Sequence, residues 1–247
     1  RGLAFALALV MLASVSVAGA TGMEIEKNGQ WYTEVSAWAK DGVEKAIDLG
    51  VAYWPSRGDA KTSISRCYFA EDAAAVVALA YGSDLAAYEG FRVLQLMRGT
   101  GDNQKYAYET LDILRGRGNG DMDFFGNITR QEAAVMLARA YRIYCDEIHD
   151  DMEPLAYADK NDIADWAKED VALITHLGVM NGIGENKFDP KGVYTLEQCF
   201  VTLVRLYEKT AQSKTPVGEN PFPLTEREKV IGCTWRSEEH TSELQSQ

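Results

Sequence analysis

The stretch GNITRQEAAVMLARAY, Gly126–Tyr141, contains the clearest structural signals of this chain. Thr129 is placed to cap a helix, and Glu132, three residues later, can accept a hydrogen bond from the Thr129 amide. Apolar residues then recur at the i, i+3, i+4, i+7, i+8 spacing of one helix face: Ala133, Met136, Leu137, Ala140 and Tyr141. The segment is therefore predicted to be an amphipathic helix that begins after Thr129.

Arg130 is not needed to form this helix. It lies in the first turn, where an exposed cation opposes the positive end of the helix dipole at a cost of about 0.3–1 kcal/mol. Such a residue is either half of a surface ion pair, which contributes little, or a ligand for an anion. Arg130 is therefore the main candidate for a binding residue.

An internal repeat organises the chain. Residues 113–141 align without a gap with residues 179–207, and nine of the 29 positions are identical, including three loop glycines and the capping threonine. Residues 36–51 likewise align with residues 164–179, and both contain Trp-Ala-Lys near the start and end in Leu-Gly-Val. A glycine just after the last helical residue is typical of a helix end. The repeating unit is therefore a helix, a glycine-containing loop and a capped helix.

Three such units are predicted, over residues 31–81, 84–144 and 156–208, the second with a divergent first helix around residues 105–114. A single helix pair cannot bury its apolar faces alone, so the units are expected to pack around a shared centre. The predicted fold is all-α, with three helix-loop-helix repeats in a pseudo-threefold bundle. Residues 209–235 have the Pro, Gly and polar composition of a linker or truncated region.

These features resemble tandem S-layer homology repeats of bacterial surface proteins. The residues that carry the resemblance are Trp38-Ala39-Lys40 with Leu49-Gly50-Val51, Ile128–Glu132, and Tyr157-Ala158-Asp159 leading to Trp166 and Asn186–Pro190. The resemblance implies an all-helical spindle whose grooves hold a secondary cell-wall polysaccharide, often bearing ketal-linked pyruvate. It implies a non-enzymatic, secreted protein held non-covalently on the cell wall or S-layer.

The resemblance also implies which residues bind the polymer. The helix-start motif supplies Arg130 together with Thr129 and Glu132, and a guanidinium beside free helix N–H groups suits a carboxylate. At the equivalent helix start of the third repeat, Leu196 replaces the arginine. That groove is expected to bind weakly or not at all.

The first repeat offers Arg66, although an alignment that begins at Tyr68 would remove Arg66 from the motif. Trp38 and Trp166 are further candidates, because an aromatic face can stack on a sugar ring. The alternative for both tryptophans is a packing role, with the ring in the core and the N–H near solvent.

The ends of the chain carry separate signals. Residues 1–20 join one basic residue to an apolar run that ends in Ala-Gly-Ala, which predicts a signal peptide cleaved after Ala20. An uncleaved membrane anchor is the alternative, and no membrane association is expected after cleavage. Residues 236–247 look like the translation of a sequencing adapter, so a catalytic domain after Trp235 is a further possibility.

Composition and motifs exclude several functions. The net charge of −12 argues against nucleic-acid binding, so any anion site must be local. The four cysteines are too widely spaced for a small disulfide framework or a metal pair, and Cys199 is expected to be a buried thiol. His149 and His176 fall in no catalytic motif, so no enzyme activity and no cofactor are predicted. A module that binds another protein remains the alternative function.

Residues 121–132, DMDFFGNITRQE, imitate a calcium-binding loop, with acids at positions one and three, glycine at six and glutamate at twelve. Phe125 at position five cannot ligate a cation, and the equivalent loop of the next repeat has lysines at two ligand positions. No metal site is therefore predicted.

Overall fold

The computed structural model describes residues 22–52, 57–81, 112–117, 123–145, 149 and 152–212. The predicted signal peptide, the linker beyond residue 212 and the adapter-like tail lie outside the described residues. The first helix expected around residues 105–114 also lies mostly outside them. None of the described helices is long and apolar enough to cross a membrane.

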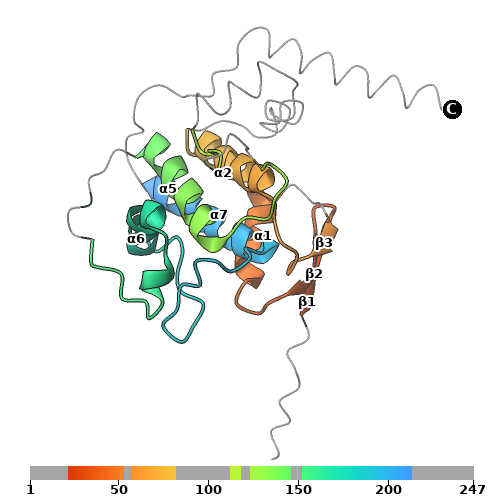
Figure 1. The fold of residues 1–247 in the computed structure, drawn as a ribbon. Helices are drawn as coiled ribbons and strands as arrows, with labels where there is room; N and C mark the ends of the chain where they lie inside the picture. The colour runs from red at the N-terminus through yellow and green to blue at the C-terminus, as the bar shows by residue number, and fades with distance from the viewer. Residues whose placement is uncertain are drawn as a thin grey trace, which may run out of the picture.

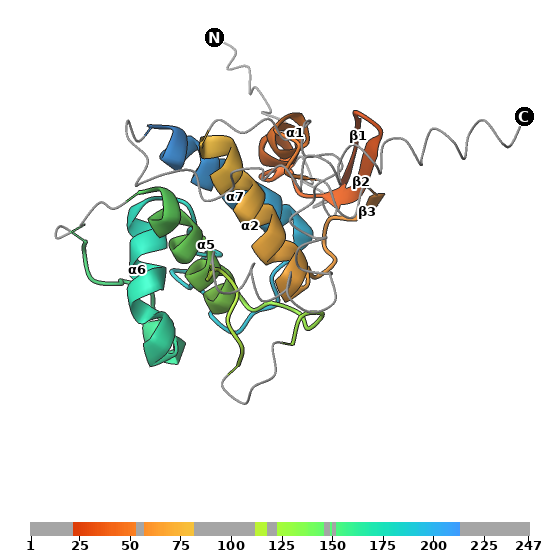
Figure 2. The ribbon, with the colours of Figure 1, turned by 90° about the horizontal axis from the view of Figure 1, so that it is seen from above.

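Three long helices form the centre of the described part (Figures 1 and 2): α2 (Arg66–Ala80), α5 (Arg130–Tyr144) and α7 (Leu196–Gln212), each in contact with the other two. Two shorter helices cover them, α1 (Lys40–Asp48) against α7 and α6 (Lys168–His176) against α5. Two short 3-10 turns, η2 (Lys160–Asp162) and η3 (Asp165–Ala167), lead into α6. The short helix α1 thus packs on a long helix from a distant part of the chain.

The helix ends follow the sequence signals. Thr129 caps α5 in the predicted capping box, in which the Thr129 hydroxyl accepts from the Glu132 amide and the Glu132 carboxylate accepts from the Thr129 amide. Gly50 and Gly178 have φ values of 73° and 70°, the left-handed conformation that a glycine after a helix provides. The capped helix and both glycine ends are confirmed.

The starts of the three long helices are joined by a closed ring of backbone hydrogen bonds. Ile64 N donates to Tyr194 O at 3.1 Å, Tyr194 N donates to Ile128 O at 3.1 Å, and Ile128 N donates to Ile64 O at 3.2 Å. Because each of these residues lies two positions before the first residue of its helix, the three helix starts are arranged cyclically. This ring brings loops that are about 64–66 positions apart in the sequence to one centre.

The prediction of an all-α fold is wrong, because a three-stranded mixed sheet lies beside α1 (Figure 1). Strands β1 (Met23–Lys27) and β2 (Gln30–Val35) form an antiparallel hairpin, and β3 (Arg57–Asp59) pairs parallel to β2. The Asn28-Gly29 turn has φ values of 51° and 77°, as a two-residue hairpin turn requires. This dipeptide between alternating strands is a hairpin signal that the helix-repeat interpretation passed over.

The sheet belongs to the same core as the helices. Tyr32 of β2 is fully buried and meets the Phe200 ring of α7 edge to face, with the ring centroids 5.2 Å apart. Cys199 is buried as a free thiol, as expected. The hairpin is therefore fixed to the helical bundle through α7.

Candidate functional site

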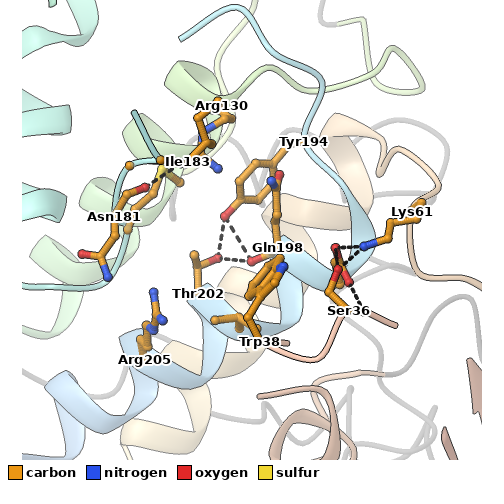
Figure 3. A pocket seen from close by; sticks show the side chains of 15 residues that line it. Ser36, Trp38, Lys61, Arg130, Asn181, Ile183, Tyr194, Gln198, Thr202 and Arg205 are labelled. Carbon is orange, nitrogen blue, oxygen red and sulfur yellow. Dashed lines mark hydrogen bonds and ion pairs between the residues drawn. The ribbon is translucent and has the colours of Figure 1, made fainter. Parts of the chain in front are cut away.

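A groove of about 550 Å³ opens beside Arg130 (Figure 3), and we call it the Arg130 groove. Its walls come from three distant segments of the chain. One wall is the loop 180–184, the floor includes the first turns of α7, and the third side is formed around Ser36 and Lys61. The remaining side chains that line it are Trp38, Arg130, Tyr194, Glu197, Gln198, Val201, Thr202 and Arg205.

Arg130 is held rigidly at one end of this groove. Its Nε donates to Phe188 O at 2.8 Å and its Nη2 donates to Asn181 O at 2.7 Å, so the guanidinium fastens the groove-wall loop to α5. Its carbon Cζ also lies 5.2 Å from the centre of the Phe188 ring and 5.7 Å from that of Tyr194, a distance typical of cation–π contact. Arg130 is only 4% exposed, so a surface ion pair is not its role.

The charge of Arg130 is not balanced by a carboxylate among the described residues. The two hydrogen bonds to carbonyls use two of the five guanidinium N–H donors. A buried cation without a counter-ion is costly, and an anion that enters the groove would relieve that cost.

The helix N–H groups near Arg130 are not free, and this part of the expectation is wrong. Arg130 N donates to Gly192 O and Gln131 N to Pro190 O, both at 3.0 Å, while Glu132 N bonds the Thr129 hydroxyl. The neighbouring loop fills the helix start because the cyclic packing of the three long helices brings it there. Any anion in the groove must therefore be recognised by side chains.

Two further cations line the groove. Lys61 is 44% exposed and pairs with Glu197 at 2.5 Å, and Glu197 also accepts from Ser36 N at 2.9 Å. Arg205 of α7 donates to Val179 O at 3.5 Å and is half-buried. Among the described residues, three cations and one carboxylate thus line the groove, in contrast to the acidic chain as a whole.

Trp38 supplies an apolar surface at the mouth of the groove. The side chain is 57% exposed, and Ile183 on the opposite wall is 51% exposed (Figure 3). The alternative in which Trp38 places its ring in the core is therefore wrong. A flat exposed ring beside cations suits a ligand that has both sugar faces and acidic groups.

Arg66 occupies an equivalent position at the start of α2, which excludes the alignment beginning at Tyr68. Its Nη2 donates to Arg115 O at 2.7 Å, as Arg130 does to Asn181 O, but its Nη1 donates to the Glu132 carboxylate at 2.5 Å. Arg117 Nε bonds the same carboxylate oxygen at 3.0 Å. We call Arg66, Glu132 and Arg117 the Arg66 cluster.

Thr129 and Glu132 therefore act inside the protein rather than in the Arg130 groove. Burial raises the pKa of Glu132, but hydrogen bonds from Thr129 and Arg117 and the charge of Arg66 outweigh it and hold the pKa below its usual value. Trp166 is 59% exposed on η3, which packs against α5, and the preceding Ala164 N bonds the Gln131 side chain. The structure brings Arg130 and Trp38 into one groove and places Arg66, Glu132 and Trp166 outside it.

Sequence reasoning missed Lys61, Gln198 and Arg205. The internal repeat could have identified Arg205 as a candidate, because Arg205 aligns with Arg139 when residues 113–141 are aligned with residues 179–207. In the structure Arg139 donates to Ile113 O and Arg205 to Val179 O, which are equivalent contacts. No sequence feature marks Lys61 as a candidate, because only the folded chain brings its loop to α7.

In the part of the chain that the structure describes, no group of three or more His, Cys, Asp or Glu residues is placed to hold a metal ion. Asp123 of the calcium-like loop instead pairs with Arg117.

The three long helices thus start around a cyclic centre, and a cation-lined groove lies beside it. Residues 156–198 match the S-layer homology domain family, so the chain contains an S-layer homology domain. The match covers η2, η3, α6, the groove-wall loop and the start of α7.

The chain is also similar to parts of three much longer proteins. It is 33% identical over 98 residues, 40% of this chain, to exoglucanase XynX of Acetivibrio thermocellus. It is 32% identical over 84 residues, 34% of this chain, to an amylopullulanase of Thermoanaerobacterium thermosulfurigenes. It is 30% identical over 116 residues, 44% of this chain, to an endoglucanase of a Bacillus species. The matches span 9%, 4% and 12% of the lengths of these relatives.

Proposed function

We propose that this protein is a secreted, non-enzymatic module that anchors itself non-covalently to the bacterial cell wall by binding an acidic secondary wall polysaccharide in the Arg130 groove. The observation that carries the proposal is one groove that combines the exposed Trp38 with a buried Arg130 that no described carboxylate neutralises. The S-layer homology match over residues 156–198 supports the wall as the location.

The groove chemistry favours a carboxylate on a sugar, such as ketal-linked pyruvate. The carboxylate would lie toward the open side of Arg130, with Lys61 and Arg205 as further cations, and the sugar face would lie on Trp38. A charge-assisted hydrogen bond of this kind contributes roughly 1.5–3 kcal/mol. Loss of one such contact would therefore weaken binding by roughly tenfold to a hundredfold.

Catalysis is not part of the proposal. Three relatives are named as enzymes, but the matches cover at most 12% of their lengths, so their activities are not transferred to this chain. The proposed role is attachment to the cell wall.

Co-sedimentation with purified cell-wall sacculi tests the proposal. Lys61→Ala and Trp38→Ala remove groove contacts, and each has a matched control outside the groove. Lys45→Ala removes an exposed lysine that pairs with Glu208, and Trp31→Ala removes a tryptophan that is 41% exposed on β2. The proposal predicts weaker sedimentation for the two groove variants and unchanged sedimentation for the two controls. If all four variants and the unmodified protein sediment equally, the wall is not bound through the Arg130 groove. That result would favour a protein-binding module.

A further inference from the structure

Glu132 and Gln198 stand at the same position of two helices that begin at the hydrogen-bonded ring. Each is the third residue of its helix, and each accepts a hydrogen bond from its own cap residue. Thr129 N donates to Glu132 Oε2 at 2.9 Å, and Thr195 N donates to Gln198 Oε1 at 3.2 Å. The two residues therefore make the same capping contact but differ in charge.

That difference decides what the neighbouring arginine meets. Arg66 and Arg130 are each the first residue of the preceding long helix, and each donates Nη2 to a loop carbonyl at 2.7 Å. The remaining carboxylate oxygen of Glu132 accepts from Arg66 at 2.5 Å and from Arg117 at 3.0 Å. An amide such as that of Gln198 cannot neutralise Arg130.

Resting on the proposed function, we propose that Glu132 is a built-in carboxylate that occupies Arg66, so that the third residues of α5 and α7 select which arginine binds an acidic sugar. Glutamate closes the Arg66 cluster, and glutamine leaves the Arg130 groove open. We call the pair Glu132 and Gln198 the selector. These two residues do not contact the sugar in this proposal; they determine which arginine is free to bind its carboxylate.

Electrostatics support this division of roles. The Arg66 and Glu132 side chains are 3% and 13% exposed, so a ligand carboxylate at the Arg66 cluster would have to displace a largely buried like charge. In the Arg130 groove the lining carboxylate, Glu197, is already engaged by Lys61 and Ser36 on the far wall (Figure 3). Arg130 therefore faces no competing carboxylate among the described residues.

Reciprocal substitutions test the selector. The variants are Gln198→Glu, Glu132→Gln and the double swap. Each substitution keeps the cap, since this chain already uses both residue types to accept the cap amide. The probe is a hexoside that bears a pyruvate ketal, with its methyl ester as the uncharged control, and isothermal titration calorimetry gives affinity and stoichiometry. Thermal melting of each variant verifies folding.

The expected results are specific to each variant. Because the equivalent carboxylate of Glu132 reaches Arg66, and Gln198 and Arg130 line one groove, Gln198→Glu should bring a carboxylate toward Arg130 and weaken probe binding by roughly tenfold or more. Glu132→Gln leaves Asp123 paired with Arg117 but removes the carboxylate that Arg66 contacts, and it should add a second binding site per chain at Arg66. Trp166 precedes α6, which packs on α5, as Trp38 precedes α1, which packs on α7, so Trp166 is the equivalent aromatic residue for the Arg66 cluster. The double swap should move the site, so that Trp166→Ala weakens binding and Trp38→Ala no longer does.

The outcomes separate this inference from the proposed function. If the unmodified protein binds the probe but Gln198→Glu keeps its affinity and Glu132→Gln gains no site, the selector is overturned and the Arg130 groove stands. If only Glu132→Gln binds the probe, Glu132 does block the Arg66 cluster, but Gln198 does not leave a binding groove open, so both the Arg130 groove and the paired role of Glu132 and Gln198 are overturned. If no folded variant binds the probe, both are overturned.

Discussion

The Nη1 atom of Arg66 donates to Oε1 of Glu132 at 2.5 Å, which joins the first turn of α2 to the first turn of α5. The contact gives α2 and α5 a charged link in addition to their apolar packing. Because Glu132 also receives bonds from Thr129 and Arg117, its pKa lies below the usual value for a glutamate.

Protonation of Glu132 at acid pH should therefore lower the free energy of unfolding. A carboxyl group whose pKa is lower in the folded state stabilises that state above its unfolded pKa of about 4.3, and this contribution is lost as pH falls through the lowered folded pKa. Glu132→Gln should reduce the free energy of unfolding by about 1–3 kcal/mol at neutral pH and by progressively less as the pH falls below the unfolded pKa. Urea titrations of both proteins across this range measure the difference. A difference that stays constant from neutral to acid pH would contradict this role of Glu132.

Arg130 should stabilise the fold in addition to binding the ligand. Arg130→Ala removes two hydrogen bonds to loop carbonyls and should lower the free energy of unfolding by roughly 2–4 kcal/mol. Arg130→Lys should recover only part of this loss, because an ammonium lacks the planar fork that reaches both Phe188 O and Asn181 O. Chemical denaturation gives the two values, and full recovery by lysine would show that the fork geometry is not required.

The hairpin turn gives a test of the sheet. Gly29 has φ of 77°, and no heavy atom of another part of the chain lies within 4 Å of the position that a Cβ would take, so alanine would meet backbone strain but no clash. Gly29→Ala should therefore destabilise the protein by about 1–2 kcal/mol. Thermal or urea unfolding measures this cost. If this segment were helical, alanine would stabilise it, so a gain in stability would argue against the hairpin.

Periodicity and capping predicted the helices well because those signals are local. The Thr129–Glu132 box and the glycines at 50 and 178 act within a few residues, and the structure has each of them as expected. The hairpin also has a local signal, the Asn28-Gly29 turn. No strand was predicted there because the repeat pattern was interpreted as wholly helical.

The groove could be predicted only in part. Arg130 and Trp38 were separate candidates in different repeats, and nothing in the sequence indicates the distance between them. The groove depends on loop 180–184, α7 and the Ser36 region meeting around the ring, which is a long-range outcome of packing. The same packing occupies the α5 amides that were expected to be free.

Attachment to a wall polysaccharide can be measured by sedimenting the protein with bacterial cell-wall sacculi before and after extraction of the secondary polysaccharide. We expect the protein to bind intact sacculi and to stay in solution with extracted sacculi. We also expect the purified polysaccharide, added in solution, to compete the protein off intact sacculi. Undiminished binding to extracted sacculi would contradict the proposed attachment and would indicate a different wall component or a protein partner.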